Sequence, residues 1–158
     1  MASSSIAEKP EPVRLSDQAR RDGSLSYIIK TAHRAFTRAL QARLKPHGVT
    51  LAQWYFLREL WIEEGLNQRE LSRRVGVSEP TTVTALNLMV RRKLAERRRR
   101  NGDRRTLYIY LTPKGRALRS SLLSDGLKVN NDAAHGLTAA DIERMKRLLL
   151  QMVDNLGI

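Results

Sequence analysis

Residues 67–115 read NQRELSRRVGVSEPTTVTALNLMVRRKLAERRRRNGDRRTLYIYLTPKG. The first part predicts two short helices: Asn67 can cap the first, which Gly76 ends, and Ser78 begins the second, which runs to about Lys93. Two such helices form the helix-turn-helix pattern, in which the second helix enters the DNA major groove and the first crosses the backbone. The spacing therefore favours a nucleic-acid-binding lobe.

A basic stretch with a hairpin turn follows directly. Asn101-Gly102 is a strong signal for a tight β-turn, and residues 106–111 are rich in side chains that favour a strand. Residues 91–105 hold nine basic and two acidic residues, a net +7 in a chain of formal net charge +13. Such an excess indicates a polyanionic partner, because each cation placed against a phosphate releases a condensed counterion. This segment is interpreted as a two-stranded wing.

Helical periodicity governs the sequence on both sides of this segment. Aromatic residues are 5% of the chain, whereas apolar residues recur at steps of three and four. Threonines that can cap helices stand at positions 50, 112 and 138. The expected flanking helices cover residues 25–45, 50–64, 113–136 and 138–156. The fold class is thus mainly α with a small β-wing.

Three regions are expected along the chain. Residues 1–20 form a disordered tail rich in Ser, Pro and Glu. Residues 49–112 form a winged helix-turn-helix DNA-binding lobe, and residues 21–48 and 113–158 together form a helical dimerisation region. The last helix carries an apolar stripe that one small lobe cannot cover, which predicts a homodimer. The stripe consists of Ile142, Met145, Leu149, Met152 and Leu156.

Several function classes are excluded by composition. The chain has no cysteine, and its three histidines stand far apart without metal-ligand spacing, so neither a metal site nor a cofactor is expected. No nucleophile–base–acid set and no Gly-rich phosphate loop is present, which argues against an enzyme. No apolar run approaches the ~20 residues that span a bilayer, and the N-terminus lacks the apolar core of a signal peptide. A cytoplasmic protein without membrane contact is expected.

Further residues complete a pattern typical of one family. DRR at residues 103–105 is followed by LTPKG at 111–115, and LS at 71–72 and GVS at 76–78 precede it. With these residues the chain resembles the MarR family of transcriptional regulators from about Leu25 to the C-terminus. The resemblance implies a homodimer whose two winged helix-turn-helix lobes bind double-stranded DNA at a palindromic operator. One departure is Lys93, where the family usually has Gly.

The buried side of the second helix of the motif is left open by periodicity. The two candidate stripes are Val83, Leu86, Val90 and Leu94 or, a quarter turn away, Thr82, Ala85, Leu86 and Met89. The register of the family favours the second stripe. This register implies that the opposite side of the second helix offers hydroxyl, amide, methyl and cationic contacts to DNA. The DNA-binding residues so expected are Ser78, Thr81, Thr84, Asn87, Leu88 and Arg91.

The family pattern implies different roles for the charged residues of the wing. Arg105 or its neighbour Arg104 enters the minor groove, where narrow A·T-rich segments concentrate negative potential. Asp103 braces the turn by a charge-assisted hydrogen bond. Arg98 and Arg99, within the run of arginines at 97–100, are expected to hold phosphates rather than read bases.

The resemblance also implies that a ligand releases the protein from DNA. Members of the family are released from DNA by small anions, often aromatic acids and sometimes CoA thioesters. A cationic stripe at steps of four on the first helix and aromatic residues of the second helix are the candidate ligand-binding residues. They are Lys30, His33, Arg34, Arg38, Trp54 and Tyr55. The expected function is a repressor released by such an effector; the alternative is a non-specific architectural DNA-binding protein, which the charge alone satisfies.

Overall fold

The computed structural model of the protein describes residues 24–157. The tail predicted for residues 1–20 lies outside this part of the chain. The chain divides into two compact units, Met1–Ala35 and Phe36–Ile158. The division falls within the first helix, α1 (Leu25–Leu44), so only its residues 25–35 and Ser24 are described in the first unit.

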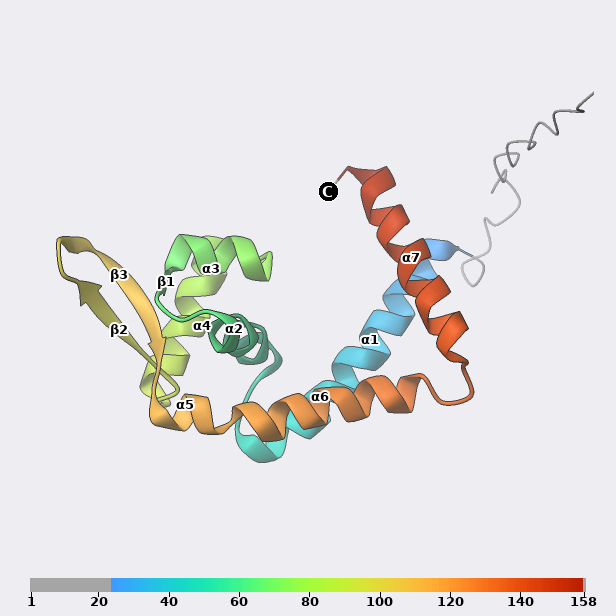
Figure 1. Ribbon diagram of the computed structural model, residues 1–158, viewed down its shortest axis with the longest axis horizontal. Coiled ribbons are helices and arrows are strands. Elements are labelled where there is room, and N and C mark those ends of the chain that lie inside the picture. Colours follow the sequence, from blue (N-terminus) through green and yellow to red (C-terminus); the bar gives the residue numbers. More distant parts are fainter. Residues whose placement is uncertain (1–23, 158) are drawn as a thin grey trace, which may run out of the picture. The chain divides into compact units, whose positions relative to one another are not determined.

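The second unit holds the remaining elements in the predicted order (Figure 1). They are the 3₁₀ helix η1 (Lys45–His47), α2 (Leu51–Ile62), β1 (Leu66–Asn67), α3 (Gln68–Val75), α4 (Glu79–Arg91), β2 (Ala95–Arg100), β3 (Asp103–Leu111), α5 (Pro113–Ala117), α6 (Arg119–Ala133) and α7 (Ala139–Leu156). The mainly helical fold with a small sheet confirms the predicted class. One expected helix, residues 113–136, is instead divided at Leu118 into α5 and α6.

Side-chain caps begin the helices where the sequence predicts them. Thr50 accepts from the backbone N–H of Gln53, and the Gln53 side chain accepts from the backbone N–H of Thr50, which closes a capping box. The same reciprocal pair forms at the start of α3 and of α7. These bonds satisfy backbone groups that a helix end otherwise leaves without partners.

The sheet contains one strand more than the two-stranded wing that the sequence predicts. Its strand order is β1-β3-β2, with antiparallel pairing throughout. β1 has two residues, Leu66 paired with Ile109 and Asn67 paired with Tyr108. Two residues carry no period-2 pattern, so only the fold reveals this strand. It joins the base of the wing to the helices.

The hydrophobic core lies where α2, α3 and α4 meet the inner face of the sheet. Its fully buried members come from these elements and, at Leu44 and Leu122, from α1 and α6. They are Leu44, Phe56, Leu57, Leu60, Leu71, Leu86, Met89, Ile109, Leu111 and Leu122.

The LTPKG segment turns the chain from the sheet into α5. Thr112 caps α5 by accepting from the backbone N–H of Gly115 at 3.1 Å. A Cβ at Gly115 would lie 2.1 Å from the carbonyl oxygen of Leu94, so only glycine permits this approach of the two backbones. The indole N–H of Trp61 donates to the Gly115 carbonyl at 3.1 Å, which ties α5 to α2.

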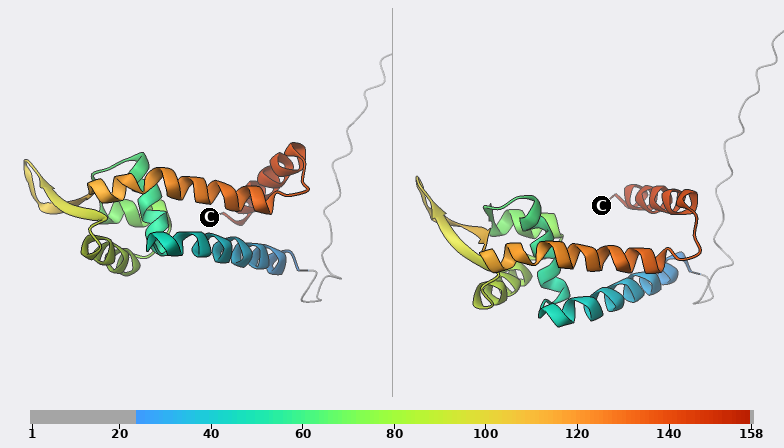
Figure 2. Two further views of the ribbon diagram at one scale, coloured as in Figure 1. Left: turned by 90° about the horizontal axis from the view of Figure 1, so that it is seen from below. Right: turned by 60° about the horizontal axis from the view of Figure 1, so that its bottom comes forward.

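The helices after α5, drawn in orange and red in Figure 2, differ in how much they bury. α6 buries Leu122 and Val129, and its Asp125 carboxylate lies 3.0 Å from Nε2 of His47 in η1. α7 buries none of its residues, although it carries the predicted apolar stripe. No helix in the described part of the chain has the length and apolarity needed to cross a membrane.

The C-terminus of α4 ends in a Schellman motif centred on Lys93. The backbone N–H of Lys93 donates to Val90 and that of Leu94 donates to Met89, both at 2.9 Å. Lys93 has a φ of 57°, and among the described residues it is the non-glycine residue with a positive φ. The departure from glycine at this position therefore leaves the geometry of the helix end intact but places a Cβ in the left-handed region.

Lys93→Gly is expected to stabilise the protein by about 1 kcal/mol, because the left-handed conformation strains a residue with a Cβ and not glycine. Thermal and urea unfolding measure the change. Lys93→Ala is the matched control: it removes the charge and keeps the Cβ, so it should give no gain. Equal stabilisation by both variants would assign the effect to charge and contradict the conformational explanation.

Candidate nucleic-acid interface

One face of α4 is buried in the core, and its identity selects between the two stripes that periodicity allows. The buried residues are Thr82, Ala85, Leu86 and Met89. Val83 and Val90, which belong to the other stripe, are only half-buried. Packing against α2 and α3 thus gives α4 the register that the family pattern favours.

The opposite face of α4 carries the predicted polar contacts. Thr81, Thr84 and Arg91 are exposed, and Asn87 and Leu88 are half-buried. The steps from Thr81 to Thr84, Leu88 and Arg91 are three, four and three, so these side chains share one side of the helix. This side combines hydroxyl, apolar and cationic groups, as readout of base edges requires.

Some of these side chains already have partners within the protein. Ser78 caps α4, and its hydroxyl lies 2.8 Å from that of Thr81. The Thr84 hydroxyl donates to the Pro80 carbonyl at 3.1 Å, which leaves its oxygen available to accept. The Oδ1 atom of Asn87 accepts from Arg97 of β2 at 2.7 Å, so Asn87 joins α4 to the wing.

The turn between α3 and α4 is held by a buried serine. The Ser72 hydroxyl donates to the Val77 carbonyl at 2.6 Å, and the Ser72 carbonyl accepts from the backbone N–H groups of Gly76 and Val77. Gly76 has a φ of 72°, the left-handed conformation that ends α3. These bonds set the angle between the two helices of the motif.

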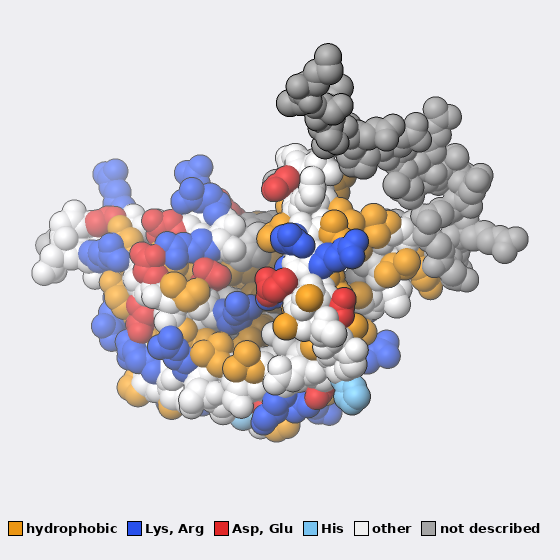
Figure 3. All heavy atoms as spheres, turned by 45° about the vertical axis from the view of Figure 1, so that its right-hand side comes forward, with side chains coloured by type: hydrophobic (Ala, Val, Ile, Leu, Met, Phe, Trp, Pro, Cys, Tyr) orange, Lys and Arg blue, Asp and Glu red, His pale blue; other side chains and the backbone are white. Residues whose placement is uncertain are grey.

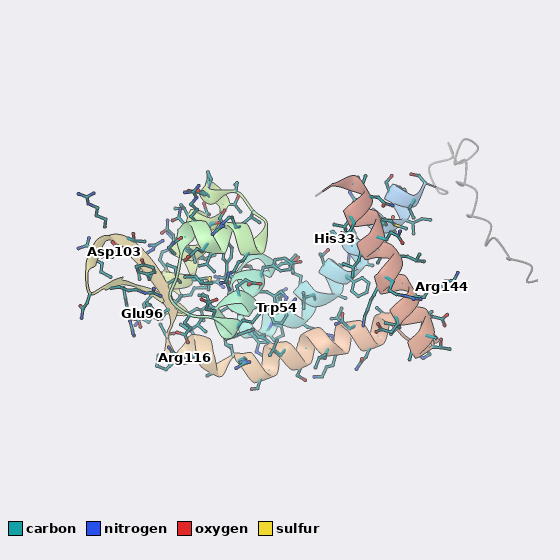
Figure 4. All side chains as sticks on the ribbon, turned by 45° about the horizontal axis from the view of Figure 1, so that its top comes forward. His33, Trp54, Glu96, Asp103, Arg116 and Arg144 are labelled. Atoms are coloured by element: carbon teal, nitrogen blue, oxygen red, sulfur yellow. The ribbon has the colours of Figure 1, made fainter. Side chains whose placement is uncertain are left out.

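The wing turn is organised around Asp103 (Figure 4). Its Oδ1 accepts from the backbone N–H groups of Arg105 at 3.0 Å and Thr106 at 2.9 Å, and its Oδ2 accepts from the Tyr108 hydroxyl at 3.0 Å. The hydrogen bonds from Thr106, followed by those from Tyr108 and Arg105, lower the pKa of Asp103 from 3.8 to about 2. The ionised carboxylate therefore holds the turn.

The order of the wing turn is expected to be lost with acid. Because the folded pKa of Asp103 lies below 3.8, its contribution is complete above 3.8 and disappears as the pH falls through about 2. The amide chemical shifts of Arg105 and Thr106 should titrate with that lower midpoint and should not titrate in Asp103→Asn. Asp132→Asn, an exposed carboxylate of α6, is the control that leaves this titration unchanged. A midpoint near 3.8 in the parent would contradict the bracing role.

The wing arginines fall into two groups. Arg97 donates to Asn87, and Arg100 donates to the Gly65 carbonyl, so both are engaged within the protein. Arg98 pairs with Glu96, and its guanidinium carbon lies 5.1 Å from the centre of the Tyr110 ring. Arg99 is exposed on the same strand.

The arginines of the wing turn come from β3. Arg105 is exposed, two residues beyond Asp103. The side chain of Arg104 lies outside the described part of the structure. Arg105 is therefore the described candidate for the predicted minor-groove contact.

Comparison with known proteins bears on this combination of helix and wing. The sequence model of the MarR family matches residues 47–106, which include α2, the helix-turn-helix and most of the wing. Over these residues the chain is similar to the MarR family. The prediction made from the DRR and LTPKG segments is thereby confirmed.

One curated relative is a helix-turn-helix regulator. The HTH-type transcriptional regulator TtmR of Methylorubrum extorquens (strain PA1) is 33% identical over 101 residues, which are 64% of this chain and 52% of that protein. The chain thus spans about half the length of this curated relative. Its name describes a regulator rather than an enzyme, in agreement with the sequence analysis.

Two solved structures share the fold of this chain. The complex of S. aureus MepR with DNA is 24% identical with a TM-score of 0.78, and the comparison covers 84% of this chain and 98% of that chain. Bordetella bronchiseptica BpsR, whose DNA binding is described as regulated by 6-hydroxynicotinic acid, is 21% identical with a TM-score of 0.74, covering 90% and 99%. The winged helix-turn-helix prediction is confirmed at the level of the fold.

The lobe also exposes two basic residues that are not among the DNA-binding residues expected from the sequence. Arg69 and Arg73 stand one turn apart on α3 and, with Asn67 and Glu70, line a cleft of about 280 Å³. α3 is the first helix of the motif, which crosses the DNA backbone when the second is in the groove. Their i, i+4 spacing in that helix was a signal visible in the sequence.

The candidate ligand residues are divided between the two units of the chain. Lys30, His33 and Arg34 lie in the first unit, and Arg38 lies in the second. Trp54 is buried in the core, its ring centroid 5.9 Å from that of Trp61 in an edge-on contact.

Tyr55, the other aromatic candidate, is 36% exposed. Trp54 therefore has a packing role in the second unit, whereas the Tyr55 side chain reaches the surface. In residues 24–157, no three His, Asp or Glu side chains are grouped so that they could hold a metal ion.

A carboxylate two residues after α2, that of Glu64, connects the lobe to α5. Glu64 accepts from Arg116 through both of its oxygens, at 2.8 and 2.7 Å, and from the backbone N–H of Leu111 at 3.0 Å. Burial raises the pKa of Glu64, but the hydrogen bonds and charge of Arg116 and the Leu111 amide outweigh it and lower the pKa overall. Figure 4 shows Arg116 at the base of the wing. This bidentate pair fixes α5 where the chain leaves the sheet.

Proposed function

We propose that the protein is a sequence-specific DNA-binding transcriptional regulator that acts as a homodimer. The observation that carries the proposal is the face of α4 that includes Thr81, Thr84 and Arg91, which is exposed because Leu86 and Met89 are buried on the other side. A wing with a braced turn extends from the same lobe (Figure 1). In this arrangement α4 reads the major groove and Arg105 enters the minor groove.

Phosphate contacts supply the affinity in this proposal. Arg99 of the wing and Arg69 and Arg73 of α3 are exposed cations without a base-reading geometry, and we assign them to the DNA backbone. The net charge of +13 fits such a partner. The DNA named for MepR is consistent with the same role in this fold.

A second copy of the chain is the proposed partner of the C-terminal helices. α7 buries none of its residues, and Met145, Leu148 and Leu149 are each more than 40% exposed. Figure 3 shows hydrophobic side chains exposed among charged ones on the side of the molecule that it presents. An 18-residue amphipathic helix with an uncovered apolar stripe needs an apolar partner. A two-fold dimer presents two α4 helices to two half-sites.

We further propose that a small anion, an aromatic acid or a CoA thioester, releases the dimer from a palindromic operator. Lys30 and Arg34, four residues apart in the first unit, are cations suited to such a ligand, and Arg38 of the second unit is a further candidate. The aromatic acid named for BpsR has this chemistry. Repression is the sign of regulation that fits release by an effector.

Selection of preferred duplexes from random DNA tests the proposal. The parent should select a two-fold symmetric sequence, and Thr84→Ala should relax the preference at one symmetric pair of bases, at about 1–3 kcal/mol. Arg99→Ala should instead lower affinity for all sequences and reduce the salt slope by about one. The two variants serve as each other's control, since one removes a base contact and the other a phosphate contact.

Two outcomes of the selection would count against the proposal. Binding without any preferred sequence would indicate the non-specific architectural alternative. A Thr84→Ala variant with the preference of the parent would contradict readout by this face of α4. Addition of 6-hydroxynicotinate or a CoA thioester to the same binding assay tests release by an anion.

A further inference from the structure

The side chain of Arg100 lies back along the sheet instead of pointing away from it. Arg100 ends β2, next to the turn at residues 101–102. Its Nη2 atom donates to the Gly65 carbonyl at 2.6 Å, and its Nε donates to the Tyr110 hydroxyl at 3.3 Å. Its guanidinium carbon lies 4.0 Å from the centre of the Tyr108 ring. One side chain therefore contacts the loop before β1 and two residues of β3.

These contacts continue into the wing turn. The Tyr108 hydroxyl, beneath the Arg100 guanidinium, donates to Asp103, and Asp103 accepts from the backbone N–H of Arg105. A chain of direct contacts thus runs from Gly65 through Arg100 to the backbone of the residue proposed to enter the minor groove.

Glycine at position 65 is a second, independent sign of this contact. Gly65 has a φ of 76°, and a Cβ there would lie 2.5 Å from Nη2 of Arg100 and 2.8 Å from the Tyr110 hydroxyl. A side chain at position 65 would occupy the space that the Arg100 guanidinium fills. Glycine therefore serves here both the left-handed turn and the close approach of Arg100.

The outer part of the wing has few other contacts to fix its direction. β1 pairs with β3 only at Tyr108 and Ile109, so the hairpin beyond them is two-stranded. The pairing of β2 with β3 also shifts in register between Arg98 and Arg100. A two-stranded hairpin is marginally stable by itself. The Arg100 contacts therefore lie in the part of the wing where few other contacts fix its direction.

We propose that Arg100 is a positioning residue, which holds the wing at a fixed direction relative to the helix-turn-helix and so presents Arg105 to the DNA. Its charge serves the protein internally and does not hold a phosphate. This inference rests on the proposed DNA-binding function. Without the contacts, binding must order the wing, and affinity falls through the loss of preorganisation.

Lysine substitution separates positioning from phosphate binding. Lysine keeps the charge that a phosphate contact needs, but it lacks the planar fork that donates from Nε and Nη2 to two acceptors. Arg100→Lys should therefore lose about tenfold in affinity for the duplex selected by the parent, with an unchanged salt slope. Arg119→Lys, at an exposed position of α6 that is assigned no contact with DNA, is the control and should bind as the parent does.

The loss should depend on the flanking sequence. Replacement of A·T by G·C pairs in the flanks of the operator should lower the DNA affinity of the parent, because Arg105 is proposed to enter the narrow minor groove of A·T-rich DNA. Arg100→Lys should reduce this preference for A·T-rich flanks severalfold. Loss of a phosphate contact would leave the preference for A·T-rich flanks unchanged. Parental affinity and parental discrimination in Arg100→Lys, with a reduced salt slope in Arg100→Gln, would overturn the proposal.

A measurement without DNA separates this inference from the proposed function. Amide hydrogen exchange at residues 103–106 of the free protein should be about tenfold faster in Arg100→Lys than in the parent and unchanged in Arg99→Lys. Faster exchange together with a parent that selects no sequence would overturn the proposed function and, with it, the presentation of Arg105. Unchanged exchange would overturn the positioning role itself.

Gly65→Ala provides the complementary variant. It should displace Arg100 and give the same faster exchange and the same loss of affinity, and combination with Arg100→Gln should add no further loss in either measurement. Gly48→Ala is its control, since Gly48 also has a left-handed φ, 66°, but nothing lies within 4 Å of a Cβ there. Additive losses in Gly65→Ala and Arg100→Gln would contradict the shared contact.

Discussion

Replacement of Leu149 by Glu is expected to convert the protein to a monomer and to reduce its affinity for a symmetric operator by about 100-fold or more. Leu149 is 41% exposed on α7, a helix with no buried residue, and it belongs to the apolar stripe proposed to contact a second copy. A carboxylate in an apolar interface is strongly unfavourable without a partner. A dimer binds two half-sites through two linked lobes and gains affinity from this linkage. Separate monomers lose that gain.

Light scattering and DNA titration measure the two parts of this result. The variant should show a mass near 18.0 kDa, whereas the parent should show twice that mass. Gln151→Glu introduces the same side chain two residues away on an exposed position of α7 and should remain dimeric. A monomeric parent at micromolar concentration would contradict the dimer, and a dimeric Leu149→Glu variant would place the interface elsewhere.

Met89→Asp is expected to unfold the DNA-binding lobe. Met89 is fully buried beside Leu86, so the substitution removes core packing and buries a carboxylate. The buried residues of the described part of the chain include no cation that could pair with it. The cost is about 4 kcal/mol or more, a large fraction of the stability of a small domain. The melting temperature should fall by more than about 10 °C.

Val90→Asp is the matched control for this experiment. Val90 is the next residue of α4 but is only half-buried, so its new carboxylate can reach water and the cost should be about 1 kcal/mol. The two variants differ by one position and have the same introduced group. If Met89→Asp were as stable as the parent while Val90→Asp unfolded, α4 would have the opposite register and Thr84 would not face DNA.

The register of α4 illustrates what a helical period leaves undetermined. Both candidate stripes contain Leu86, and they differ by about a quarter turn, which a 13-residue helix does not resolve. Burial of Thr82 decides the matter in the fold: its hydroxyl donates to the Ser78 carbonyl at 3.1 Å, so a polar residue is accommodated in the core. Hydrophobicity by itself favours valine over threonine there. The resemblance to the family, not periodicity, led to the right stripe.

The roles of the wing arginines were likewise not visible in the run of basic residues. Arg97 and Arg100 are engaged by Asn87 and Gly65, residues that are distant in sequence. Neighbouring arginines on a strand alternate between its two faces, so a single run serves several purposes. Only the position of α4 and of the loop before β1 distinguishes an internal contact from an exposed cation.

Local signals in the sequence determined the helix starts, the hairpin turn, the basic wing and the resemblance to the MarR family. Caps, Asn101-Gly102 and the LTPKG segment act over a few residues, and their physics is contained in the residues themselves. The tertiary structure decided the third strand, the buried face of α4, the break at Leu118 and the partners of Arg100. Each of these depends on which distant group the fold brings within contact, and no local pattern of residues contains that information.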